Sequence, residues 1–132
     1  MQTETCEAVV AHCIDFRFRK VLNEYLMSRF PEGYDLISIA GGVKELVEKR
    51  DSSFVLQQLK ISHNLHQPKI IVLIQHEDCG AYGGSKKFAG PEEEKEFQSD
   101  QLQKAEAILK EIFPDCAIEK YFALLSGEIV QI

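Results

Sequence analysis

One uninterrupted aliphatic run limits most strongly what this chain can fold into. The run covers residues 70–74 and follows Pro68. Five residues are far too few to cross a membrane, which takes about 20 in a helix. A short strand that is apolar on both faces is typical of a parallel sheet with helices packed on each side. Residues 69–75 therefore predict a central strand of an α/β sheet.

The remaining elements follow from apolar periodicity and from capping residues. Further strands are predicted at residues 8–13 and 35–39, and residues 116–132 predict two strands joined at Ser126-Gly127. Helices are predicted at residues 19–30, from Ser52 or Ser53 to His66, and at residues 92–113, with a glycine-rich loop at residues 76–91. This order predicts a three-layer α/β fold with a mostly parallel sheet of four to five strands.

Length and charge restrict the number of domains and the class of partner. The chain has 132 residues, which predicts a single domain over residues 1–132. Its formal net charge of −6, without a basic patch, argues against nucleic acid and anionic membranes as partners. Residues 1–7 carry two glutamates and no basic residue. A secretory signal is therefore not expected, and the predicted location is cytoplasmic.

The four cysteines are the first chemical feature to explain. They are too few for a disulfide scaffold, so cysteines close to histidines point to metal or thiol chemistry. Cys13 follows the first strand, and His76 and Cys79 follow the aliphatic strand. Ligands in parallel sheets bind beyond the carboxyl ends of the strands, so these side chains are expected to meet there. Two thiolates and one imidazole suit zinc and leave its fourth position open, as in catalytic zinc sites.

Two charged residues belong to the same segment as Cys13. If the chain stays extended as far as Arg17, Cys13, Asp15 and Arg17 face one side. Ile14 and Phe16 would then face the other side. A thiolate, a carboxylate and a guanidinium are therefore expected in one pocket.

The pattern Cys-x-Asp-x-Arg, followed about sixty residues later by His-x-x-Cys-Gly, resembles the β-class carbonic anhydrases. Residues 40–42, Ala-Gly-Gly, are similar to the Asn-Ala-Gly segment of that family, and the likeness runs from residue 8 to about residue 84. The resemblance implies zinc held by Cys13, His76 and Cys79, reversible hydration of carbon dioxide to bicarbonate, and an Asp15–Arg17 dyad beside the metal. It also implies a homodimer or a higher homo-oligomer.

The chain departs from the family pattern in four places. Phe16 replaces a small residue, Ser38-Ile39 replaces Arg-Asn, a helix is added at residues 19–30, and only seven residues precede the first strand.

The chemistry of the metal explains why an Asp–Arg dyad would be useful beside it. Two thiolates cancel the formal charge of Zn²⁺, so a bound water is harder to ionise and a neighbouring acceptor becomes useful. Asp15 can accept a hydrogen bond from that water or hydroxide, while Arg17 keeps Asp15 ionised and turned away from the metal. Gly41 and Gly42 can bring backbone amides to bicarbonate, or can simply form a strand-to-helix turn.

Other interpretations stay open at this point. A non-catalytic zinc protein, or a zinc hydrolase of carbonyl sulfide or carbon disulfide, would use the same residues. His12-Cys13-x5-Arg19 fits the outline of cysteine phosphatases, although the intervening residues contain no glycine.

The remaining candidate groups are expected to be structural. His12 is expected to be packed, and Cys6 and Cys116 to be structural thiols. His63 and His66 are expected near the C-terminal end of a helix, where the helix dipole favours positive charge. Residues 92–94 are expected to form a solvated first helical turn, where the dipole favours negative charge.

Overall fold

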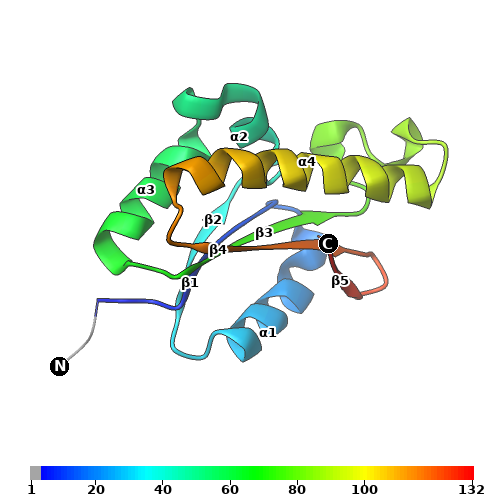
Figure 1. The fold of residues 1–132 in the computed structure, drawn as a ribbon. Helices are drawn as coiled ribbons and strands as arrows, with labels where there is room; N and C mark the ends of the chain where they lie inside the picture. The colour runs from blue at the N-terminus through cyan, green and yellow to red at the C-terminus, as the bar shows by residue number, and fades with distance from the viewer. Residues whose placement is uncertain (1–3) are drawn as a thin grey trace.

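The computed structural model describes residues 4–132, which form alternating strands and helices (Figure 1). The strands are β1 (Ala8–His12), β2 (Tyr34–Ser38), β3 (Ile70–His76), β4 (Ala117–Ala123) and β5 (Ile129–Gln131). The α-helices are α1 (Arg19–Arg29), α2 (Lys44–Lys49), α3 (Phe54–His66) and α4 (Pro91–Ile112). Short 3₁₀ turns lie at Phe16–Phe18, Arg50–Ser52, Gly80–Tyr82 and Ser85–Lys87.

The five strands form one sheet in the order β2-β1-β3-β4-β5. The pairs from β2 through β4 are parallel, and β5 runs antiparallel to β4 at the edge. The aliphatic run forms β3 in the middle of the sheet, where every residue after Ile70 is buried. The predicted mostly parallel sheet and its C-terminal hairpin are thus confirmed.

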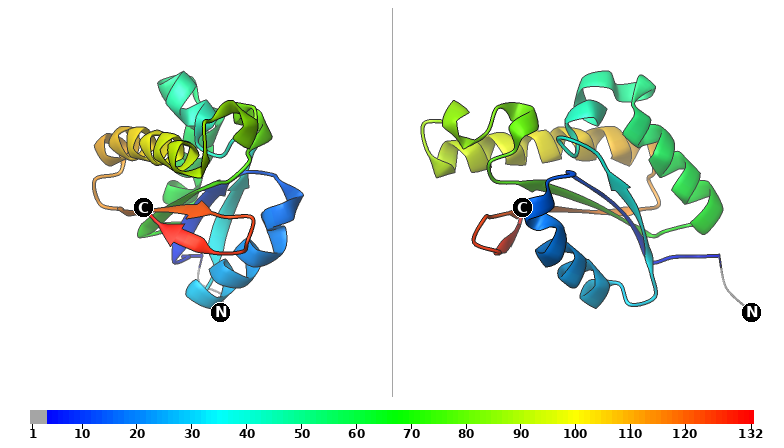
Figure 2. Two further views of the ribbon diagram at one scale, coloured as in Figure 1. Left: turned by 90° about the vertical axis from the view of Figure 1, so that its right-hand side faces the viewer. Right: turned by 180° about the vertical axis from the view of Figure 1, so that it is seen from behind.

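Helices cover both faces of the sheet and make three layers (Figures 1 and 2). On one face, α2, α3 and α4 pack on alternate residues of the strands, such as Val9, Ile71 and Leu73. On the other face, α1 packs on the intervening residues, such as Val10 and Val72. This two-sided burial explains why residues 70–74 of β3 are all aliphatic.

The predicted helix boundaries hold within about a residue at most ends. Ser53 caps α3, and its side chain accepts a hydrogen bond from the backbone N–H of Leu56. The short helix α2 was not predicted, because a six-residue helix is too short to show a periodic pattern. The predicted loop at residues 76–91 contains the two 3₁₀ turns Gly80–Tyr82 and Ser85–Lys87.

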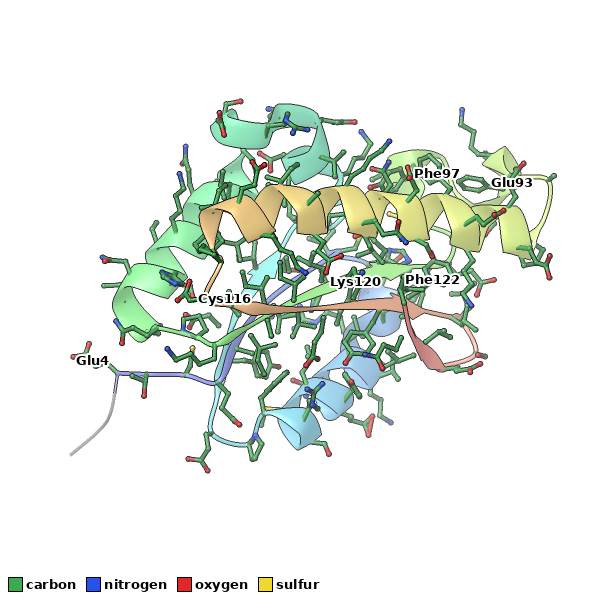
Figure 3. The ribbon with its side chains drawn as sticks, in the orientation of Figure 1. Glu4, Glu93, Phe97, Cys116, Lys120 and Phe122 are labelled. Atoms are coloured by element: carbon green, nitrogen blue, oxygen red, sulfur yellow. The ribbon has the colours of Figure 1, made fainter. Side chains whose placement is uncertain are left out.

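Parallel pairing brings the carboxyl ends of β1, β3 and β4 to one edge of the sheet. His12 at the end of β1 pairs with Ile74, and His76 at the end of β3 pairs with Ala123. Figure 3 shows the two ends of β4, with Cys116 near its start and Phe122 near its finish. Among the helices of residues 4–132, none has the length and apolar character needed to span a membrane.

Candidate metal centre

Three potential metal ligands meet at the carboxyl ends of β1 and β3. Cys13 directly follows β1, His76 ends β3, and Cys79 lies in the turn after it. All three are buried, and each offers a ligand atom within 4.8 Å of the other two. The two sulfur atoms are 4.0 Å apart. The predicted convergence of these three residues is therefore present in the structure.

The donor atoms fit a zinc ion. His76 Nδ1 donates to the carbonyl of Glu77 at 2.7 Å, which leaves Nε2 as the atom with a free lone pair. This Nε2 is buried and has no hydrogen-bond partner among the described residues. Sulfurs bound tetrahedrally at about 2.3 Å would lie about 3.8 Å apart, close to the separation seen here. The orphaned imidazole nitrogen and the paired sulfurs are what a Cys₂His zinc site requires.

The two thiols share a proton rather than behave alike. The hydrogen bond with Cys79 lowers the pKa of Cys13, and the same contact with Cys13 raises the pKa of Cys79. His76 and the backbone N–H of Gly41 also lower the pKa of Cys13. Of the two sulfurs, Cys13 is therefore the one whose surroundings favour the thiolate, which is the form that binds cations.

Asp15 and Arg17 form a multiply bonded ion pair beside these ligands. The guanidinium donates from Nη2 to Asp15 Oδ2 at 2.7 Å, and from Nε to both carboxylate oxygens. The side-chain hydrogen bonds of Arg17 lower the pKa of Asp15 to about 2. Asp15 Oδ2 also lies 3.9 Å from His76 Nε2. The carboxylate is thus an ionised acceptor next to the free nitrogen of His76.

The expected extended path from Cys13 to Arg17 is wrong. The chain turns at Asp15, whose carboxylate accepts the backbone N–H of Arg17 and caps the 3₁₀ turn Phe16–Phe18. Strand alternation therefore ends before Arg17. The pairing of Asp15 with Arg17 comes from this turn, and not from a shared strand face.

An open cavity of about 700 Å³ lies in front of the dyad. Its lining residues are Cys13, Ile14, Asp15, Phe16, Arg17, Ala40, Asp78, Gly80 and Ala81. The prediction that Ile14 and Phe16 face away from the charged residues is wrong, because the turn brings both into the same wall. Phe16 is 81% exposed, so the mouth of the cavity is apolar.

Asp78 is a site residue that the sequence patterns did not reveal. Arg17 donates from Nη1 to Asp78 Oδ2 at 3.0 Å and from Nη2 to the Asp78 carbonyl at 2.9 Å. The only hint in the sequence is its position between His76 and Cys79.

Gly41 and Gly42 form the turn that follows β2. Both have positive φ, at +84° and +59°. A Cβ on Gly42 would clash with Gln75 Oε1, and the Gly42 N–H donates to the carbonyl of Ile39. These contacts favour the structural role of the turn, and bicarbonate binding by the two glycines stays a prediction.

Gln75 was also missed by sequence reasoning. This buried residue accepts from the Val43 N–H and donates to the Gly41 carbonyl, the Tyr82 hydroxyl and Gln98 Oε1. It therefore ties the glycine turn to the end of β3. The sequence signal that could have found it is a polar residue directly after the aliphatic run of residues 70–74.

Cys13 and Arg19, which fit the cysteine phosphatase pattern, do not line the same cavity. Arg19 lines a small cavity together with His12 and α1, whereas Cys13 lines the cavity of the dyad. His12 is buried, as expected, and its Nδ1 bonds the carbonyl of Cys13.

The two histidines near the end of α3 have acidic partners. His66 bonds Asp35 at 2.7 Å, and His63 bonds Asp115 at 3.2 Å. Cys6 and Cys116 lie near these pairs. That neighbourhood was not foreseen, because it depends on contacts between distant segments.

The acidic turn at residues 92–94 is only partly solvated. Glu92 and Glu93 are exposed as expected, but the expectation is wrong for Glu94, which is 2% exposed.

Comparison with known proteins identifies relatives of the whole chain. The family described as "Putative carbonic anhydrase" matches residues 3–132. An "Uncharacterized protein" of Rickettsia bellii is 28% identical over 127 residues, covering 91% of this chain and 77% of that protein. A second "Uncharacterized protein", from Rickettsia conorii, is 27% identical over 127 residues, covering 91% of this chain and 68% of that protein.

Solved structures share the fold at low sequence identity. The β-carbonic anhydrase isoform I of Trichomonas vaginalis superposes with a TM-score of 0.71 at 17% identity, covering 100% of this chain and 86% of that one. Tetrameric β-carbonic anhydrases of Sordaria macrospora give a TM-score of 0.62 at 13% identity, with 98% and 82% covered. The three-layer architecture is therefore that of the β-carbonic anhydrases.

Proposed function

Because the chain belongs to the family described as "Putative carbonic anhydrase", we propose that it is a zinc enzyme that reversibly hydrates carbon dioxide to bicarbonate. One observation carries this proposal. The buried Nε2 of His76 has no partner among the described residues and lies beside two cysteine sulfurs, with an ionised carboxylate 3.9 Å away.

Cys13, His76 and Cys79 would hold the zinc. The carbonyl of Glu77 fixes the orientation of the His76 ring, which is how outer hydrogen bonds set a metal-ligating imidazole. When bound, zinc supplies a nucleophile at neutral pH by lowering the pKa of a coordinated water. Three protein ligands leave one position for that water.

Asp15 would orient the attacking water. Its pKa of about 2 means that Oδ2 is an acceptor, and not a proton donor, at neutral pH. Arg17 holds this carboxylate through hydrogen bonds to both of its oxygens. With those bonds in place, Asp15 would accept a hydrogen bond from the water and would be kept from taking the metal position itself.

The cavity suits a small uncharged substrate. Four of its lining residues, Ile14, Phe16, Ala40 and Ala81, offer no side-chain hydrogen bonds. A small linear molecule such as carbon dioxide needs no hydrogen bond from the cavity wall to reach the dyad. Carbonyl sulfide and carbon disulfide share these properties, so they are the substrates to compare.

We also propose that the chain acts as a homo-oligomer. The solved proteins of Sordaria macrospora are tetrameric and share its fold. Two large apolar side chains, Ile14 and Phe16, are exposed at the cavity mouth, where a second copy would remove them from water. Light scattering on the purified protein tests this point. The single domain over residues 1–132 and the cytoplasmic location stay predictions.

Rates with three substrates test the function. Zinc-loaded wild type and Asp15→Asn would be assayed with carbon dioxide, carbonyl sulfide and carbon disulfide. We expect the highest kcat/KM for carbon dioxide and a loss of about 100-fold or more in the variant, which cannot act as a charged acceptor. Faster turnover of either sulfur compound would reassign the substrate. Bound zinc without any turnover would favour a non-catalytic zinc protein.

A further inference from the structure

Asp78 has a backbone conformation that needs support. Its φ of +60° lies in the left-handed region, which residues other than glycine rarely adopt, although aspartate is among the more tolerant. Its N–H donates to Glu94 Oε2 at 2.7 Å, and its Oδ1 accepts the N–H of Ser85 at 2.8 Å. These contacts hold Asp78 in one orientation between two ligand residues, His76 and Cys79.

Glu94 anchors this loop from α4. Its carboxylate is buried, and its second oxygen, Oε1, accepts the hydroxyl of Ser85 at 2.8 Å. A buried carboxylate is costly unless its oxygens are hydrogen-bonded, and both oxygens of Glu94 are. Its position in the first turn of α4 adds the favourable field of the helix dipole. Glu94 is therefore placed to fix the loop and not to interact with solvent.

Asp78 in turn supports Arg17 on the side away from Asp15. Asp15 alone could swing together with the guanidinium, because Arg17 is a long side chain and about a third exposed. The two bonds from Arg17 to Asp78, through Nη1 and Nη2, fix the other edge of the guanidinium. An unbroken path of hydrogen bonds thus runs from Glu94 through Asp78 and Arg17 to Asp15.

We infer that Asp78 and Glu94 are positioning residues, which hold Arg17 and through it Asp15 at the orientation that the reaction needs. This inference rests on the proposed carbonic anhydrase function. Neither residue needs to touch the substrate or the metal for this role. A loop that only shaped the metal site would act through Cys79 instead, and would change zinc binding first.

Three variants separate these possibilities. Asp78→Asn keeps the size and tolerates the backbone conformation, but it removes the charge that faces Arg17. Glu94→Gln places an amide donor against either the Asp78 N–H or the Ser85 hydroxyl. The matched control is Glu93→Gln, since Glu93 is exposed in the same turn of α4 (Figure 3) and its carboxylate accepts the N–H of Ala89, outside the path from Glu94 to Asp15.

Activity and metal content form the first readout. We expect Asp78→Asn and Glu94→Gln to keep one zinc per chain and an unchanged KM, while kcat falls about 10- to 100-fold, as for a misplaced catalytic group. Glu93→Gln should match wild type. Unchanged kcat in both test variants would overturn the inference, as would a loss of activity that follows the loss of zinc.

A second readout does not depend on activity. The Nε–H signal of Arg17 in ¹⁵N NMR spectra of the zinc-loaded protein should shift and exchange faster with water in Asp78→Asn than in wild type or Glu93→Gln. If wild type proves inactive, the proposed function fails, and this signal still decides whether Asp78 holds Arg17. An identical signal in all proteins would overturn the positioning role. Asp78 is partly exposed, so its variant is expected to fold even if the buried Glu94 tolerates no change.

Discussion

Asp15 Oδ2 lies 3.9 Å from Nε2 of His76, close enough for the carboxylate and the imidazole to face the same ion. The carboxylate is held in this place by Arg17, which bonds both of its oxygens. The distance explains why the guanidinium matters. A free carboxylate at this point is a competent zinc ligand and would block the open position.

Removing the guanidinium should therefore spare the metal and stop the reaction. In Arg17→Ala we expect one zinc per chain and a kcat about 100-fold or more below wild type, because Asp15 becomes free to bind the ion. Metal analysis and stopped-flow hydration assays measure the two effects. The matched control is Arg29→Ala, which breaks another bidentate pair, with Glu119, away from the site. Unchanged turnover in Arg17→Ala would contradict the dyad.

Replacing a metal ligand should, in contrast to Arg17→Ala, weaken zinc binding itself. Cys13→Ser, His76→Ala and Cys79→Ser should each lower zinc affinity at least 100-fold, since losing even an outer hydrogen-bond partner of a ligand costs 10- to 100-fold. Cys116→Ser is the control, because Cys116 is a buried thiol near the start of β4. Competition with a chromophoric chelator measures the affinities. Full zinc binding by Cys13→Ser would show that the metal site lies elsewhere.

The glycine turn should be sensitive to a single methyl group. Gly42→Ala adds a Cβ that would meet Gln75 Oε1, besides forcing alanine into a left-handed conformation. Gly127 also has a positive φ, of +99°, but a Cβ added there would meet open space. We expect Gly127→Ala to cost about 1–2 kcal/mol of unfolding free energy and Gly42→Ala about 1–3 kcal/mol more. Urea unfolding measures both, and equal costs would refute the close contact.

One ion pair should make stability depend on pH. The hydrogen bonds from Arg29 lower the pKa of Glu119. Its contribution is then fully present above the unfolded pKa of about 4.3 and is lost as the pH falls through the lower, folded value. Glu119→Gln should destabilise the protein by about 1 kcal/mol or less at pH 7 and by less at pH 3. Urea unfolding at both pH values gives the comparison, and a pH-independent difference would argue against the pair.

The sequence predicted most of the fold because burial leaves a clear pattern. β3 is apolar on both faces since helices cover it on both, and Ser53 caps α3 as its residue type suggests. Cys13, His76 and Cys79 could be placed because parallel strands end at the same edge of a sheet.

What the sequence did not predict depends on turns and on contacts between distant segments. Ile14 and Phe16 were misplaced because the chain leaves the extended conformation at Asp15. The roles of Asp78 and Glu94 were missed for a related reason. The role of Asp78 follows from a positive φ, and Glu94 differs from its exposed neighbours only through tertiary packing.

Zinc content and carbon dioxide hydration, measured on one preparation across pH 7 to 9, decide whether the chain is a zinc-dependent carbonic anhydrase. We expect one zinc per chain and a hydration rate that rises with pH, as more of the bound water ionises. A protein without zinc, or one with stoichiometric zinc and no hydration at any of these pH values, would contradict the proposed function.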